Sequence, residues 1–357
     1  MGMTQNASPL SPDSEALQSM GFDPALHRKF AAGIESGLLR DLHVVLAARS
    51  QQLVLEHYGV GSDENWGTPL VSVAFDADTL HDLRSVTKSI VSLLYGIALD
   101  KGLVPPPDAP LYEQFPEYGD LAKDAARAKI TIGHALTMTL GMEWDEDRPY
   151  TDPLNSEIAM ENAPDRYRFV LERPMIAEPG TRWIYSGGSV ALVGAIIERG
   201  TGKRLPDFAR AALFEPLDIT KFHWSAGYDG VASAASGLRL TAPDLLKIGM
   251  LLLQKGVWNG QRIVSEEWIA RSLTPAISTG DGLDYGMLWF CGDAPVPAFA
   301  NPRRWHAGFG NGGQRLWLMP DAGIAAVIYS GKYNAWDAWI TPTRVWREII
   351  LANFLKA

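Results

Sequence analysis

Segments with the pattern of β-strands stand near both ends of this chain, and a long helical stretch separates them. Near the start, Leu42–Ala47 and Gln52–Tyr58 flank a short polar turn and predict a hairpin. In the last third, strands are predicted for Tyr285–Phe290, Arg304–Gly308, Gln314–Met319 and Ile324–Ser330. Because strands at both ends need partners to bury their apolar faces, the pattern favours an antiparallel sheet completed across the sequence. The helical middle is then a second lobe, and the fold class is α+β.

The domain boundaries follow from this pattern. Residues 1–22 are rich in Ser, Pro and Asp and predict a flexible N-terminal arm. We expect residues 23–110 and 237–357 to form the sheet lobe and residues 111–236 to form the helical lobe. Further helices are predicted for Phe22–Gly37, Pro243–Gln254, Ser265–Ser272 and Pro342–Leu355.

Composition narrows the class of protein. The 357 residues are 46% hydrophobic and carry a formal net charge of −9, with no basic run, so nucleic acid is not an expected partner. The single cysteine, Cys291, excludes an intramolecular disulfide and any site built on several cysteines. The N-terminus lacks the features of a signal peptide, and no apolar run reaches membrane-spanning length. We therefore expect a cytoplasmic protein, either a monomer or a homodimer.

The pattern Ser-x-x-Lys opens an apolar helical segment at Ser85 and Lys88. Residues three apart share one face of a helix, so the serine hydroxyl and the lysine amine can meet. A serine becomes a strong nucleophile only when a base takes its proton. Lysine can be that base only if burial or a cationic neighbour depresses its pKa from about 10.4. The alternative is a helix that merely carries these two residues, because so short a pattern recurs by accident.

Two later stretches offer the other parts of an acyl-transfer site. Tyr185 stands in a glycine-flanked turn before a helix, and with a depressed pKa beside Lys88 it could relay a proton; alternatively it is an aromatic plug between lobes. Gly308 ends a predicted strand and would let the backbone N–H of Phe309 approach a ligand. That N–H and the N–H of Ser85 are then candidate donors of an oxyanion hole, unless the glycines only bend a hairpin.

A long acidic and aromatic segment, Glu143–Pro153, interrupts the helical middle. It contains Trp144 and Tyr150. A loop of this length is a candidate lid over a substrate, although an ordinary surface loop is the alternative.

The order Ser85-x-x-Lys88, Tyr185-Ser186-Gly187 and His306-Ala307-Gly308 resembles the serine β-lactamase and penicillin-binding-protein superfamily, in its class C, esterase-like branch. Within that branch the chain resembles the 6-aminohexanoate-dimer (nylon-oligomer) hydrolases. Four further stretches carry this resemblance: Glu143–Asp147, Thr151–Pro153, Ala234–Leu238 and Gly313–Leu318. The resemblance covers roughly residues 25–355. It implies a five-stranded antiparallel sheet flanked by helices, an all-helical lobe and a site between the two lobes.

Departures from the family pattern bear on the substrate. Class C β-lactamases have Asn where this chain has Gly187, and Lys where it has His306. Trp144 takes the place of a lid tyrosine, and Ile158 stands where efficient amide hydrolysis in the nylon-oligomer hydrolases uses an acidic residue. The resemblance therefore implies esterase activity before amidase activity, and weak or no β-lactam hydrolysis. The implied substrate-binding residues are Trp144, Tyr150, Gly187, His306 and Gly308.

The expected protein is thus a serine acyl hydrolase that uses Ser85, Lys88 and Tyr185 through an acyl-enzyme on small esters or short linear amides. No cofactor or metal is expected, because the histidines show no H-E-x-x-H or other metal spacing, and a strand rather than a helix follows the G-x-G-x-x-G match at 308–313. Two alternatives stay open. One is a D-amino-acid amidase or peptidase that accepts an amine through Asp145 or Asp147, and the other is a catalytically silent scaffold of the same fold.

Overall fold

The computed structural model describes residues 12–357 and divides into two compact units. The first unit comprises Met1–Asp82, Leu240–Leu253 and Asp293–Ala357; the second comprises Leu83–Arg239 and Gln254–Gly292. Helices and antiparallel strands occur in both, and the predicted α+β class is confirmed. The division differs from the expected one, because residues 83–110 and 254–292 belong with the helical middle.

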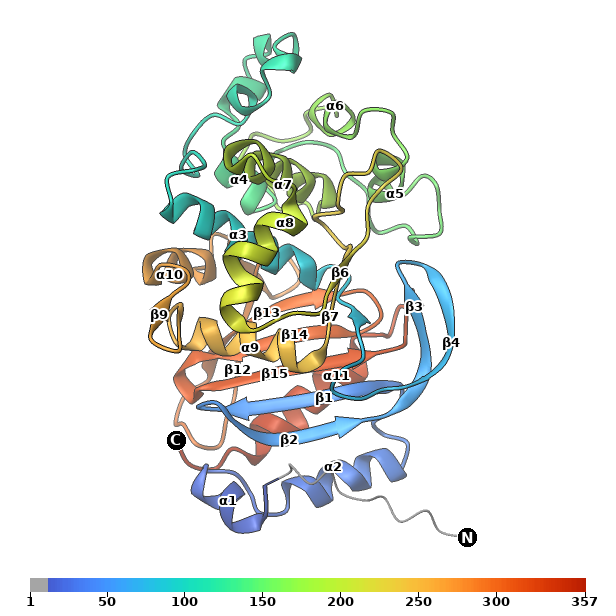
Figure 1. The fold of residues 1–357 in the computed structure, drawn as a ribbon, viewed down its shortest axis with the longest axis vertical. Coiled ribbons are helices and arrows are strands. Elements are labelled where there is room, and N and C mark those ends of the chain that lie inside the picture. Colours follow the sequence, from blue (N-terminus) through green and yellow to red (C-terminus); the bar gives the residue numbers. More distant parts are fainter. Residues whose placement is uncertain (1–11) are drawn as a thin grey trace. The chain divides into compact units, whose positions relative to one another are not determined.

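A five-stranded antiparallel run forms the centre of the first unit, in the order β13-β14-β15-β1-β2 (Figure 1). These strands are β13 (Arg303–Gly310), β14 (Gln314–Met319), β15 (Ile324–Ser330), β1 (Leu42–Arg49) and β2 (Gln52–Tyr58). The strands from the two ends of the chain meet where β1 pairs with β15, in the register Ala47↔Ala326. The prediction of a sheet completed across the sequence is therefore confirmed.

Helices cover both faces of this sheet. Helix α9 (Ala242–Leu253) approaches one face closely at Gly249, where an added Cβ would lie 3.0 Å from Leu316. On the opposite face, Trp317 stacks on Trp346 with ring centroids 5.4 Å apart. Trp346 belongs to the C-terminal helical segment, which consists of α11 (Ile340–Arg344), η8 (Val345–Ile350) and η9 (Leu351–Asn353). Because both faces are covered, every residue of β14 and β15 is buried.

The first unit also contains elements that the sequence pattern did not predict. Helix α1 (Ser14–Ser19) occupies part of the expected arm, and its N-terminus is capped by Asp13, whose Oδ1 accepts from the backbone N–H of Ala16 at 2.8 Å. Residues 1–11 of that arm lie outside the described residues. A hairpin of β3 (Val60–Asn65) and β4 (Thr68–Ala74) and the short strand β5 (His81–Asp82) follow β2. In contrast to these elements, helix α2 (Leu26–Glu35) was predicted, within the range Phe22–Gly37.

Two long helices, α3 (Val86–Asp100) and α7 (Gly187–Thr201), form the centre of the second unit. Every residue of α3 from Val86 to Ala98 is buried, so this helix is enclosed on all sides. Helix α10 (Glu266–Leu273) packs against α3. The shorter helices that pack against α7 are α4 (Ile132–Leu136), α5 (Ser156–Glu161), α6 (Arg166–Leu171) and α8 (Leu205–Ala209). Single turns complete the unit: η1 (Tyr112–Gln114), η2 (Pro116–Tyr118), η3 (Leu121–Lys123), η4 (Arg127–Lys129), η5 (Arg210–Phe214) and η6 (Glu215–Leu217).

The short strands of this part of the chain are β6 (His223–Trp224), β7 (Leu238–Leu240), β8 (Val257–Trp258), β9 (Gln261–Arg262), β10 (Ile277–Ser278), β11 (Asp284–Tyr285) and β12 (Phe290–Ala294). The prediction of one strand over Tyr285–Phe290 is wrong, because a turn separates β11 from β12. In that turn Leu288 has φ +65°, and two serines of α3 donate to its carbonyls, Ser92 to Met287 and Ser89 to Leu288, each at 2.7 Å. The turn thus helps to hold α3 in place.

Among residues 12–357 no helix combines the length and the apolar composition that crossing a membrane requires.

Candidate active site

Ser85 lies immediately before the first residue of α3, at the end of a sharp backbone turn. The turn depends on Arg84, whose φ of +48° is uncommon for a residue with a side chain and costs on the order of 1–3 kcal/mol. One helical turn further on, Lys88 places its Nζ 2.9 Å from Ser85 Oγ. The serine and the lysine of the Ser-x-x-Lys pattern are therefore in direct hydrogen-bond contact.

Lys88 is 1% exposed, and acceptors surround its amine. Nζ donates to the backbone carbonyl of Ala235 at 3.0 Å and lies 3.7 Å from Glu157 Oε2. Burial lowers the pKa of Lys88, but the opposing pull of Tyr185, Glu157 and Glu146 is larger, so the pKa is raised above its ordinary value. The amine is therefore an ammonium at neutral pH, and the expectation of a depressed lysine pKa is wrong.

Tyr185 precedes α7 and faces Lys88. The Nζ atom of Lys88 lies 4.9 Å from the centre of the tyrosine ring. Helix α7 begins after Ser186, whose Oγ accepts from the N–H of Ser189 at 3.1 Å. Burial raises the pKa of Tyr185, while the Lys88 ammonium and a hydrogen bond with Ser85 lower it by less. The resting phenol is therefore neutral, and the expected depression of its pKa is wrong as well.

Two glutamates that the sequence reasoning missed complete the cluster. Glu157 is 3% exposed, and Ser236 Oγ donates to its Oε1 at 2.7 Å. Glu146 accepts from the indole Nε1 of Trp144 at 2.6 Å, from the hydroxyl of Tyr150 at 2.9 Å and from the backbone N–H of Gly187. Burial, and then repulsion by Glu157, raise the pKa of Glu146 to about 7.

The absence of a side chain at Gly187 has a steric explanation. A Cβ at this position would lie 2.5 Å from Glu157 Oε2 and 3.1 Å from Glu146 Oε1. The two carboxyl groups thus occupy the space beside the position at which the class C pattern has Asn. A sequence signal existed for one of them, because Glu146 lies in the acidic segment of the candidate lid; Glu157 had none.

The segment Glu143–Pro153 is tied down by its own contacts. The guanidinium of Arg148 bridges Asp145 Oδ2 at 2.9 Å and Asp152 Oδ2 at 3.3 Å. Trp144 and Tyr150 both donate to Glu146, as described above. The structure therefore brings these two predicted binding residues together around one carboxylate.

A small apolar pocket adjoins Trp144. It is lined by Leu140, Gly141, Met142, Trp144, Val170, Ile184, Ser186 and Ser189. Gly188 permits close packing here, because an added Cβ would lie 2.6 Å from the indole of Trp144. The space inside it, about 10 Å³, is roughly that of one water molecule, so the lining side chains are closely packed.

The other predicted site residues, His306, Gly308 and Phe309, lie on β13 in the first unit. Burial, together with the nearby Arg304, lowers the pKa of His306 to about 4. This ring is therefore neutral, so the position lacks the positive charge of the lysine in the class C pattern. The roles expected for these three residues stay predictions.

Comparison with known proteins gives concordant results. A family model described as Beta-lactamase matches residues 30–340. The 6-aminohexanoate-dimer hydrolase of Paenarthrobacter ureafaciens is 26% identical over 328 residues, which cover 85% of this chain and 74% of that protein. Esterase EstB of Burkholderia gladioli is 26% identical over 220 residues, which cover 60% of this chain and 54% of the relative. A penicillin-binding protein homologue from Caulobacter crescentus superposes with a TM-score of 0.68 at 18% identity, covering 94% of this chain and 97% of that one.

Proposed function

Because the chain belongs to the beta-lactamase family, and its relatives include proteins named hydrolase and esterase, we propose that it hydrolyses small esters through an acyl-enzyme formed on Ser85. The observation that carries the proposal is the 2.9 Å contact between Ser85 Oγ and Lys88 Nζ, with Tyr185 beside the same amine. Short linear amides are secondary substrates in this proposal, and no cofactor takes part.

The protonation states of Lys88 and Tyr185 determine how Ser85 is activated. In the resting site Lys88 is an ammonium and Tyr185 is a neutral phenol, so neither can accept the serine proton. The reactive form is the one in which the Lys88–Tyr185 pair has lost a single proton. The apparent pKa of this loss belongs to the pair and not to either residue. The population of this form, and with it the rate, should rise with pH.

The chemical steps then follow in order. Ser85 Oγ attacks the ester carbonyl carbon while its proton passes to the deprotonated Tyr185–Lys88 pair, and the carbonyl oxygen becomes an oxyanion. The intermediate expels the alcohol, which takes the proton back from the pair, and the acyl group stays on Ser85. Water then attacks the acyl-enzyme by the same proton route, releasing the acid and restoring the serine. The backbone N–H groups of Ser85 and Phe309 are the proposed oxyanion donors.

The decisive experiment is active-site labelling with a fluorophosphonate followed by mass spectrometry, together with assays on p-nitrophenyl esters, linear amides and nitrocefin. The wild type should be labelled on Ser85 and should turn over short esters fastest. Ser85→Ala should lose both labelling and turnover. Ser189→Ala, which changes a serine of a neighbouring G-G-S sequence, should still be labelled on Ser85. A label on Ser189, or ester turnover by Ser85→Ala, would refute the assignment.

A further inference from the structure

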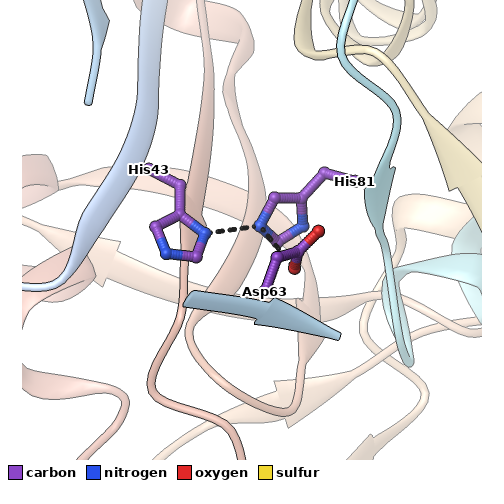
Figure 2. A group of neighbouring side chains, drawn as sticks. All are labelled: His43, Asp63 and His81. Atoms are coloured by element: carbon purple, nitrogen blue, oxygen red, sulfur yellow. Dashed lines mark hydrogen bonds and ion pairs between the residues drawn. The ribbon is translucent and has the colours of Figure 1, made fainter. Parts of the chain in front are cut away.

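His43, Asp63 and His81 form a compact buried cluster in the first unit, and each comes from a different strand (Figure 2). His43 lies on β1, Asp63 on β3 and His81 on β5. Their side chains are 2%, 2% and 0% exposed, and one ligand atom of each lies within 4.8 Å of the other two. Groups that titrate or bind metals are seldom buried this completely unless they are paired or coordinate an ion.

The donor atoms converge on one point. The Nδ1 atom of His81 lies 3.0 Å from the backbone carbonyl of Asp82, which can only accept, so Nδ1 carries a proton. The other ring nitrogen, Nε2, lies 2.8 Å from Nδ1 of His43 and 3.5 Å from Oδ1 of Asp63. Because His81 Nε2 has no hydrogen, it accepts, and Nδ1 of the neutral His43 donates to it. Loss of that one proton leaves two nitrogen lone pairs and a carboxylate oxygen close together, an arrangement that a cation can fill.

We propose that these three side chains bind one divalent transition-metal ion in place of that proton, and that Zn²⁺ is the ion the ligand set favours. Two imidazoles and one carboxylate suit zinc and its neighbours in the periodic table, whereas calcium and magnesium prefer oxygen ligands alone. Zinc–nitrogen bonds of about 2.0–2.1 Å in a tetrahedral site place two ligand nitrogens about 3.3 Å apart. The rings of His43 and His81 must therefore separate by about 0.5 Å, while the contact between His81 and Asp63 already has a suitable length.

Outer contacts hold two of the proposed ligands in orientation. The hydroxyl of Tyr333 donates to Oδ1 of Asp63 at 2.7 Å, and the carbonyl of Asp82 accepts from His81. Metal-binding carboxylates and histidines usually have such partners, which fix the orientation and the tautomer of the ligand. His81 also stacks on Tyr329 with ring centroids 4.5 Å apart.

The ring of His43 is held by a space that only glycine leaves open. A Cβ on Gly61 or on Gly331 would lie 2.5 or 2.4 Å from Nε2 of this ring. The ring stacks on Phe75 with centroids 4.2 Å apart. Its Nδ1 is thereby directed toward His81. All three ligands are thus positioned before an ion arrives, which lowers the ordering cost of binding.

The test is stoichiometric metal binding by the full chain. Protein freed of metal with a chelator should be incubated with Zn²⁺, both in its native state and during refolding from urea, because the buried site needs an opening event to admit the ion. After dialysis, one zinc per chain by elemental analysis and a higher melting temperature than in chelator are expected. Co²⁺ should give the intense visible absorption of a tetrahedral site.

Single-residue variants test whether any bound zinc lies at His43, Asp63 and His81. Asp63→Asn preserves shape and should reduce zinc affinity by more than Tyr333→Phe, which removes only an outer partner and should cost about tenfold to a hundredfold. His57→Gln, on the adjacent strand β2, should bind as the wild type does. Failure to bind zinc in both the native and the refolding arms would overturn the proposal and leave a proton-linked network. Equal binding by Asp63→Asn and the wild type would overturn it too, because the ion would then lie elsewhere.

Discussion

Replacing Glu157 by Gln tests how the buried carboxyl pair sets the protonation of the candidate active site. The substitution keeps the size of the side chain and an oxygen that can accept from Ser236, but it removes the negative charge 3.7 Å from the Lys88 amine. That charge stabilises the ammonium. Without it, the Lys88–Tyr185 pair should lose its proton at lower pH, and the reactive form should be populated earlier.

The expected magnitude follows from the distance. Two unit charges 3.7 Å apart at an effective dielectric constant of about 20 interact by about 4 kcal/mol. Since 1.36 kcal/mol corresponds to one pKa unit, loss of this charge alone would lower the apparent pKa of the Lys88–Tyr185 pair by about 3 units. The rise of kcat/KM with pH would move down by the same amount. Glu146, with a pKa of about 7, is already ionised in the alkaline range, so its charge beside the amine is the same in both proteins. We therefore expect the rise of kcat/KM with pH to move down by up to about 3 pH units.

The measurement is kcat/KM for a p-nitrophenyl ester across the alkaline range, read at a wavelength where the product absorbs equally in both protonation states. Glu172→Gln, an exposed change that removes one of the two carboxylate partners of Arg168 in the same unit, is the matched control and should leave the profile in place. The displacement should persist at high salt, since buried pairs are poorly screened. A Glu157→Gln profile that coincides with the wild type, with activity retained, would refute the protonation states proposed above for Lys88 and Tyr185.

Three further predictions follow from the described contacts. Gly187→Ala should reduce ester turnover at least tenfold and lower the melting temperature, because its Cβ would overlap Glu157. Adding Glu157→Ala should restore stability, and a double variant no more stable than Gly187→Ala would contradict the steric explanation. Trp144→Phe should raise KM by severalfold while keeping the fold, because it removes the indole donor to Glu146 beside the apolar pocket; unchanged kinetics across ester chain lengths would reduce the segment to a surface loop. Burial raises the pKa of Glu161 to about 7 from 4.5, so the folded state binds this proton more tightly; the free energy of unfolding should fall by about 3 kcal/mol as pH rises from 4.5 to 7, and urea titrations of Glu161→Gln should lack this component.

The sheet was predictable because its strands are continuous apolar runs closed by clear turns. The predicted bounds of β14, β15 and β2 agree with the structure. The hairpin of β3 and β4 was not predictable, because its strands are short, polar and largely exposed, and β4 carries Pro69. The single strand predicted over Tyr285–Phe290 failed because backbone carbonyls in that stretch accept from the serines of α3 and do not continue a ladder.

The contact between Ser85 and Lys88 was predictable from helical spacing alone, because both residues lie on one turn. The charges around them were not. Glu157 comes within 3.7 Å of the amine from a short helix, and Glu146 acts on its pKa from a loop. Both residues are far along the chain from Lys88, so no local sequence pattern indicates these interactions. The same limit applies to His43 and His81, which are 38 residues apart and meet only because β1 and β5 bring them together. Searching for metal motifs by spacing could not find that cluster.

The carboxyl pair also supplies a physical reason to expect poor β-lactam hydrolysis, independent of the missing Asn and Lys of the class C motifs. A β-lactam antibiotic carries its own carboxylate, which must be accepted near the nucleophile. Here Glu157 already neutralises the Lys88 ammonium, and Glu146, with a pKa of about 7, adds further negative charge as pH rises above neutrality. His306, which stands where the class C pattern has Lys, is neutral. A neutral ester would meet none of this repulsion, so we expect the proposed site to disfavour anionic substrates whatever their ring strain or leaving group.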